Sequence, residues 1–207
     1  MFRRCLFLLC LLSSASTLAG DLLSSSPDAV VKQMVEDVLT PIRQDKEITH
    51  DPGKIDELVD ASIFPRLDFI RLTRLTVGNK FWKRTSPEVQ QQLVSEFHVF
   101  LVRVFSDVIA QYTDQTIFYF PLKMPPDAKE VTVKTVVMDP RDESTLLDYR
   151  LERTGTGWLI YDVDIDNMSL IRIYHSNFGD TLSHGGVPNL ISVLHKKNQE
   201  VTAARHG

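Results

Sequence analysis

The side chains that could do chemistry in this sequence are histidines, serines, aspartates and tyrosines. The histidines are His50, His98, His175, His184, His195 and His206. No pair of them has zinc-ligand spacing with a third ligand nearby, so we expect no metal site. Ser169 and Ser183 lie outside any nucleophile-elbow sequence. These residue types therefore give no sign of a hydrolase or a metalloenzyme.

Two further patterns resemble ligand-binding motifs but lack a part that each motif needs. Asp162, Asp164 and Asp166 alternate with apolar residues, yet the loop spacing and the glycine of a calcium-binding hand are missing. We interpret them as a solvated strand face. Gly155-Thr156-Gly157 is glycine-rich like a phosphate-binding loop, but no helix start follows it. We interpret it as a hairpin turn.

The elements around these residues change from helices to strands near Gln115. From there, apolar residues alternate with polar ones, which predicts strands over Thr116–Leu122, Val131–Met138, Thr145–Glu152 and Trp158–Ile165. The breaks between them are of turn length, so neighbouring strands should pair antiparallel.

Alternation divides the predicted strands into two faces. One face should carry Val131, Val133, Thr135, Val137, Leu147, Tyr149, Leu151, Leu159, Tyr161, Val163 and Ile165. The opposite face should carry Lys134, Asp148, Arg150, Glu152, Asp162 and Asp164, with Trp158 and Ile160 among them. An enzyme built on such a sheet needs a carboxylate or histidine on the inward face to move protons. Among ionisable groups, the apolar face offers only two tyrosines.

Helices are expected on both sides of these strands in the sequence. Start signals lie at Ser26-Pro27 and Asp51-Pro52, and Thr85 with Glu88 has the spacing of a capping box. The helix that follows Thr85 should reach Tyr112. It is apolar over more than one stripe, so it is buried on several sides or lines a cavity. Ser169 should cap a further helix.

These elements predict one α+β domain over residues 20–207. It has N-terminal helices, a curved antiparallel sheet of about four strands, and C-terminal helices after Ser169, with a break at Gly185-Gly186. Residues 1–19 read as a secretory signal peptide cleaved after Ala19, since a basic start precedes a short apolar run and small residues. The apolar run is shorter than the roughly 20 residues that span a bilayer.

Removal of this segment changes the chemistry of what remains. Cys5 and Cys10 are the only cysteines of the chain, so the exported part would have no thiol, disulfide or thiolate metal site. Arg3 and Arg4 would leave too, which moves the net charge from −4 to −6. An acidic chain of this kind is not expected to bind nucleic acid.

Four segments, in order, resemble the MlaC family, also called toluene-tolerance auxiliary proteins. They cover residues 78–90, 149–163, 168–178 and 186–194, and include Gly78, Trp82, Thr85 and Gln90, Gly157-Trp158, Ser169 with Asn177-Phe178, and Gly186. The resemblance extends from about Ser26 to Asn198. Two departures are Asn167-Met168, where a glycine usually precedes the serine, and Arg71-Leu72 to Arg74-Leu75, in place of an arginine-methionine pair.

The resemblance implies a cavity-forming fold of the nuclear-transport-factor type. It also implies a periplasmic carrier that holds phospholipid acyl chains inside, leaves the headgroup outside, and uses no cofactor. Its partners would be an outer-membrane lipoprotein–porin complex and an inner-membrane ABC transporter, and we expect a monomer. Such a carrier would help to maintain outer-membrane lipid asymmetry.

From the face assignment, ten residues are expected to line the cavity and contact lipid. They are Phe100, Val104, Val133, Leu147, Tyr149, Leu151, Tyr161, Val163, Ile165 and Ile171. Two other interpretations stay open: a small isomerase or dehydratase on the same cavity fold, and a periplasmic interaction module with a solid core.

Overall fold

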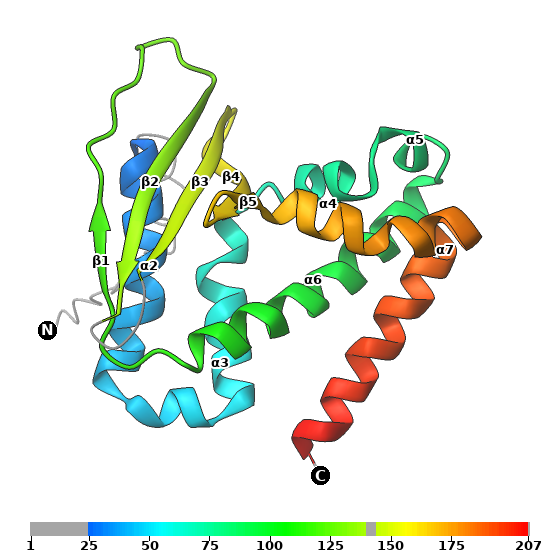
Figure 1. The fold of residues 1–207 in the computed structure, drawn as a ribbon, viewed down its shortest axis with the longest axis horizontal. Helices are drawn as coiled ribbons and strands as arrows, with labels where there is room; N and C mark the ends of the chain where they lie inside the picture. The colour runs from blue at the N-terminus through cyan, green and yellow to red at the C-terminus, as the bar shows by residue number, and fades with distance from the viewer. Residues whose placement is uncertain (1–24, 140–143, 207) are drawn as a thin grey trace, which may run out of the picture.

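The computed structural model describes residues 25–139 and 144–206, and Figure 1 shows their arrangement. The predicted signal peptide lies outside the described residues. The α+β class is confirmed, with helices before and after an antiparallel sheet. The elements in chain order are α2 (Pro27–Gln44), η1 (Lys46–His50), α3 (Pro52–Ser62), η2 (Phe64–Arg66), α4 (Phe69–Val77), α5 (Asn79–Trp82), α6 (Pro87–Ile109), β1 (Thr116–Tyr119), β2 (Glu130–Met138), β3 (Thr145–Thr154), β4 (Gly157–Ile165), β5 (Met168–Ser169) and α7 (Leu170–His206).

Helix starts follow the local signals closely. Asp51 accepts hydrogen bonds from the backbone N–H groups of Gly53 and Lys54, and so caps α3. In α6 the cap is Ser86, one residue after the predicted Thr85. The predicted extension of α6 to Tyr112 is too long by one turn. The helix ends at Ile109, three residues short of Tyr112.

The sheet contains five strands in the order β1-β2-β3-β4-β5, and every neighbouring pair is antiparallel. The strand that the sequence did not predict is β5, which follows a two-residue turn. Asp166 and Asn167 occupy that turn with φ of 47° and 66°. Asp and Asn tolerate this left-handed conformation, which tight hairpin turns require.

A β-bulge in the β3–β4 pair changes which side chains of β4 face the core. Tyr149 pairs with Val163, but Leu151 pairs with Ile160, so the register shifts between Arg150 and Leu151. An extra residue in one strand reverses the alternation beyond it. Trp158 and Ile160 therefore lie on the apolar inner face, where they are buried. The predicted inward positions of Leu159 and Tyr161 are wrong.

Helix α2 lies across the inner face of the sheet (Figure 1). Its apolar stripe packs against the centre of the strands, and together they form a core of Val30, Val31, Met34, Val133, Tyr149, Leu151, Trp158 and Ile160. From Val35 onward, α2 supplies the four buried residues of a smaller core, which are Val35, Val38, Leu39 and Ile42.

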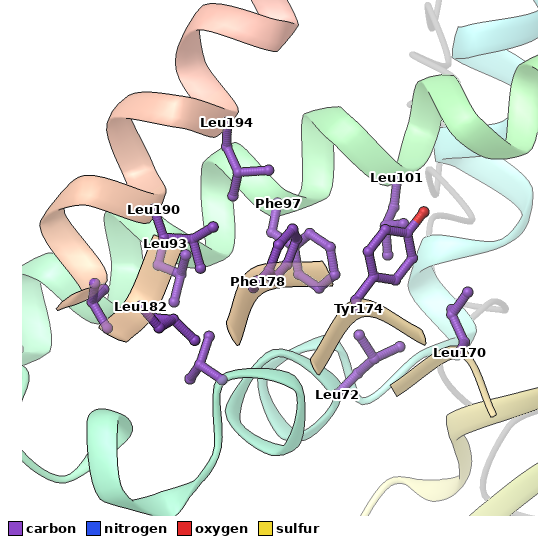
Figure 2. Packing of buried hydrophobic residues seen from close by; sticks show 12 residues of the cluster. Leu72, Leu93, Phe97, Leu101, Leu170, Tyr174, Phe178, Leu182, Leu190 and Leu194 are labelled. Atoms are coloured by element: carbon purple, nitrogen blue, oxygen red, sulfur yellow. The ribbon is translucent and has the colours of Figure 1, made fainter. Parts of the chain in front are cut away.

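A second large core lies among helices α4, α6 and α7, as Figure 2 shows. Phe97 of α6 is at its centre. Its ring centroid lies 5.4 Å from the rings of both Tyr174 and Phe178, in edge-to-face contacts. Aromatic pairs in this geometry stabilise a core beyond their buried area. The helical core is thus separate in composition from the core between α2 and the sheet.

The chain bends sharply inside α7. Gly186 has φ 65° and ψ −161°, outside the helical region, and Pro188 follows it. Glycine adopts a positive φ without the steric cost that a side chain brings. The predicted break at Gly185-Gly186 is confirmed. Beyond it, the last part of α7 runs back beside α6 (Figure 1), where Asn198 donates a 3.0 Å hydrogen bond to the carbonyl of Glu96.

Candidate ligand-binding site

A pocket of about 360 Å³ opens where the ends of α2 and α6 meet the first three strands. Its lining residues are Leu39, Val108, Ile109, Gln111, Tyr112, Gln115, Ile117, Val137, Asp139 and Thr145. The aliphatic side chains come from helices α2 and α6 and from strands β1 and β2. Gln111 and Gln115 lie between α6 and β1, and Asp139 follows β2. Aliphatic walls with a few polar groups are typical of sites for apolar ligands.

The local sequence explains why the pocket forms at this end. Ile117 and Val137 are paired residues on β1 and β2, and both lie on the inner face of the sheet. Helix α6 ends at Ile109, and Val108 in its last turn is 65% exposed. The premature end of α6 therefore leaves an apolar helix end and an apolar strand end without a full covering.

Seven of the ten predicted lining residues are half-buried, and six of these lie elsewhere than on the outer face of the sheet. The six are Phe100, Val104, Leu147, Val163, Ile165 and Ile171. Phe100, Val104 and Ile171 pack on the edge of the helical core. Leu147 and Val163 pack on the edge of the core between α2 and the sheet. None of the ten lies among the residues that line the 360 Å³ pocket.

Three other predicted residues are core. Val133, Tyr149 and Leu151 are buried against α2, with exposed fractions of 1%, 6% and 0%. Burial raises the pKa of the Tyr149 phenol well above its ordinary value, although the nearby Thr135 side chain acts to lower it. The Thr135 hydroxyl donates to the carbonyl of Leu147, at 3.1 Å. A phenol in this position stays neutral at physiological pH and cannot act as a base.

Tyr161 lies on the outer face of the sheet because of the β-bulge. The Arg71 guanidinium lies over its ring, 3.7 Å from the centroid, and the Tyr161 hydroxyl donates to Glu130 at 3.4 Å. Arg71 also pairs with Glu130 at 2.7 Å and with Glu152. Tyr161 therefore contacts this charged cluster on the outer face, and its predicted position on the inward face is wrong.

The inner face carries no acid or histidine along the described residues of strands β1 to β4. Its polar members are Tyr119, Thr135, Thr145 and Tyr149, with Arg153 at the far end, where the guanidinium lies 4.9 Å from the Trp158 ring. The general acids and bases of an enzyme on this face would have to come from elsewhere.

Four of the histidines, His98, His175, His184 and His195, have hydrogen-bond partners in the structure. His98 lies 4.1 Å from the Phe64 ring and 2.7 Å from a carboxylate oxygen of Asp60. His195 lies 2.8 Å from Glu96. Within residues 25–139 and 144–206, no group of three or more His, Cys, Asp or Glu side chains could hold a metal ion. Over the same residues, no helix is both long enough and apolar enough to cross a membrane.

The sequence reasoning missed the pocket itself. Leu39, Val108 and Ile109 are visible as parts of apolar stripes, and Val137 is visible on the predicted inner face. The missing information was where α6 ends, because this end decides which of these side chains are covered. The polar run Gln111 to Gln115 was the available signal for an earlier helix end.

The fold and the pocket define an α+β protein with an opening between helices and an antiparallel sheet, and half of the residues that line this opening are aliphatic. The family described as MlaC protein matches residues 32–196. The chain therefore belongs to the MlaC family.

Two known proteins show the likeness in more detail. The toluene tolerance protein ttg2D of Pseudomonas putida is 21% identical over 164 residues, which are 79% of this chain and 76% of that protein. The structure of a phospholipid-binding protein from Ralstonia solanacearum, in complex with a phospholipid, superposes with a TM-score of 0.79 at 34% identity. That likeness covers 86% of this chain and 99% of the other.

Proposed function

We propose that this protein binds phospholipid, with the acyl chains against the inner face of the sheet and the headgroup outside, and carries it between membranes. The observation that carries the proposal is the apolar pocket at the open end of the sheet, in a fold shared with a phospholipid-bound protein at 34% identity. The half-buried aliphatic residues beyond the pocket extend the apolar surface.

The energetics favour a carrier that works by burial alone. Each buried methylene contributes about 0.8 kcal/mol, so acyl chains bind well without a charged anchor. A volume of about 360 Å³ is near the lower end of the range of roughly 300–1,000 Å³ for small-molecule pockets. A phospholipid with two chains therefore requires the pocket to widen toward Leu147, Val163 and Ile165 on the sheet and toward Val104 on α6.

The fold offers a way to widen. The helical core and the core between α2 and the sheet have no buried member in common. If the helical core moved away from the core between α2 and the sheet, the half-buried residues at the edge of each would become exposed, and neither core would be broken. Release of lipid would then be a shift between closed and open populations, driven by a partner that prefers the open form.

The cellular role belongs to the same proposal. Residues 1–19 would direct export to the periplasm. The partners would be an outer-membrane lipoprotein–porin complex and an inner-membrane ABC transporter. Catalytic residues and a cofactor are not needed in this scheme, because no bond of the lipid is made or broken.

Native mass spectrometry of the protein purified from the periplasm tests binding. We expect an added mass that disappears on organic extraction, with phospholipid recovered in the solvent. A protein that carries no lipid and takes none up from liposomes would contradict the proposal and favour an enzyme or an interaction module. Transfer of fluorescent phospholipid between two liposome populations tests the carrier role, and it should rise with protein concentration.

A matched pair of variants separates the inner face from the outer face. Ile165→Asp places a carboxylate on the inner face, while Leu146→Asp places one on the outer face in the neighbouring strand. We expect Ile165→Asp to lose most of the bound lipid and Leu146→Asp to keep it, with both proteins folded by circular dichroism. Equal retention in the two variants would rule out the inner face as the lipid site.

A further inference from the structure

The free edge of the sheet is its most unusual surface. Strand β1 is the first in the sheet order, and within the described residues no strand pairs with its other side. Figure 1 shows β1 at the margin of the sheet. Exposed edges usually carry lysine, proline or a bulge that prevents pairing with other chains. The sequence Thr116 to Phe120 has no charge, no proline and no glycine.

An apolar patch accompanies this edge on the outer face. Its members are Phe118, Phe120, Met138 and Leu146, which are 50%, 43%, 41% and 41% exposed. The rings of Phe118 and Phe120 contact each other edge to face, with centroids 5.3 Å apart. Contiguous exposed apolar surface of this kind marks an interaction site.

The backbone pattern shows which groups of the edge are available. The N–H of Phe120 donates to the carbonyl of Lys134 in β2, at 3.0 Å. Because hydrogen-bonded positions alternate along an antiparallel strand, the N–H and C=O groups of Ile117 and Tyr119 point away from β2. They can pair with another strand. A lipid bilayer cannot satisfy an open strand edge, so insertion of this surface into a membrane is disfavoured.

We propose that this edge pairs with β1 of a second copy of the chain, antiparallel about a two-fold axis at Phe118. In this register Ile117 of one copy pairs with Tyr119 of the other, and both pairs exchange N–H···O bonds. Phe118 then faces its own copy across a pair that is not hydrogen-bonded, where side chains approach closest. The two sheets become one continuous sheet.

Charge on either side of the strand supports a second copy as the occupant. Asp114 precedes the uncharged segment and Lys123 follows it, and both are exposed. An antiparallel arrangement brings the Asp114 end of one strand to the Lys123 end of the other. The strand is therefore complementary to itself in backbone pattern, in side chains and in flanking charge. A strand of four residues buries little surface, so the dimer should be weak and reversible.

Cysteine cross-linking tests the register directly. The full chain with Cys5 and Cys10 replaced by serine has no other cysteine. A non-hydrogen-bonded pair has a Cα separation of about 4.5 Å, within the roughly 4.4–6.8 Å that a disulfide spans. We expect Phe118→Cys to form a disulfide-linked dimer on mild oxidation. Leu146→Cys, equally placed on the outer face but two strands from the edge, should stay monomeric. Equal cross-linking of the two variants, or none of Phe118→Cys, would overturn the register.

Sedimentation velocity of the native chain tests the dimer independently. We expect the weight-average mass to rise with concentration, and Phe118→Lys to weaken association at least tenfold because two like charges would meet at the axis. A native protein that stays monomeric up to its solubility limit would show that the edge does not serve a second copy. This result would leave lipid binding untouched. The dimer, if observed, replaces the sequence-based expectation of a monomer.

Discussion

The hydroxyl of Ser169 donates a 2.7 Å hydrogen bond to the carboxylate of Asp162, and both side chains are buried. The same hydroxyl accepts from the backbone N–H of Arg172 at 3.2 Å, so it also caps the first turn of α7. The Asp162 carboxylate accepts in addition from the N–H of Ile171, at 3.2 Å. This pair fixes the angle at which α7 leaves the sheet.

Ser169→Ala should lower the free energy of unfolding by about 1–3 kcal/mol, because it leaves a buried carboxylate short of a donor and removes a helix cap. Urea denaturation measures the change. Ser192→Ala in the same helix is the control, since its hydroxyl donates to the carbonyl of Pro188 but is exposed. A loss of the same size in both variants would show that burial at Ser169 is not the cause.

Phe97→Ala should destabilise the protein by about 3–5 kcal/mol, because it opens a cavity at the centre of the helical core. Phe97 is 1% exposed and contacts rings from α7. Thermal and urea denaturation measure the loss. Val99→Ala, a truncation at an exposed position on the same helix, should cost less than about 0.5 kcal/mol. A small loss for Phe97→Ala would mean that the surrounding helices collapse into the space.

Alkaline pH should weaken the fold through Tyr149. Burial raises the pKa of this phenol in the folded state, while the unfolded value is about 10. The contribution is therefore complete below pH of about 10 and is lost as the pH rises further, because only the unfolded chain can ionise there. Each such group lowers the free energy of unfolding by at most about 1.4 kcal/mol per pH unit.

Tyr149→Phe should therefore flatten the decline in unfolding free energy above pH of about 10. Urea titrations at several pH values measure the slope. Tyr161→Phe is the control. Burial and Glu130 raise the pKa of Tyr161, but this residue is only partly buried, and Arg71 and Arg150 oppose the rise. We therefore expect Tyr161→Phe to change the slope less than Tyr149→Phe does. Identical slopes in Tyr149→Phe and the native chain would contradict the argument.

Arg71→Ala should cost about 1–3 kcal/mol, because the guanidinium joins Glu130 and Glu152 and covers the Tyr161 ring. Chemical denaturation at low and high salt checks this. Arg43→Ala removes an exposed pair with Glu36 and should change stability by less than about 1 kcal/mol. Comparable losses in the two variants would mean that the Arg71 cluster acts as an ordinary surface pair.

Much of the fold could be predicted because its signals are local. The caps at Asp51 and Ser169, the break at Gly186 and the two-residue period of the strands each depend on a few neighbouring residues. The position of Tyr161 could not be predicted in this way. The bulge between Arg150 and Leu151 exists only when β3 and β4 pair, and one extra residue is enough to exchange the faces.

The candidate site was harder to predict than the fold for a similar reason. Periodicity identifies apolar faces, but it does not show whether another element covers them. Val133 and Val163 lie on the same face, yet α2 buries the first and leaves the second half-buried. The distinction between core and lining depends on the path of helices from distant parts of the sequence.

The bend at Gly186 has a consequence for the order of events during synthesis. Val187, Leu190 and Leu194, which follow the bend, supply buried side chains to the helical core around Phe97. They are synthesised after all the other buried members of that core. The helical core therefore cannot close until the residues beyond Gly186 have been synthesised, and we expect Phe97 to stay exposed in the nascent chain until then.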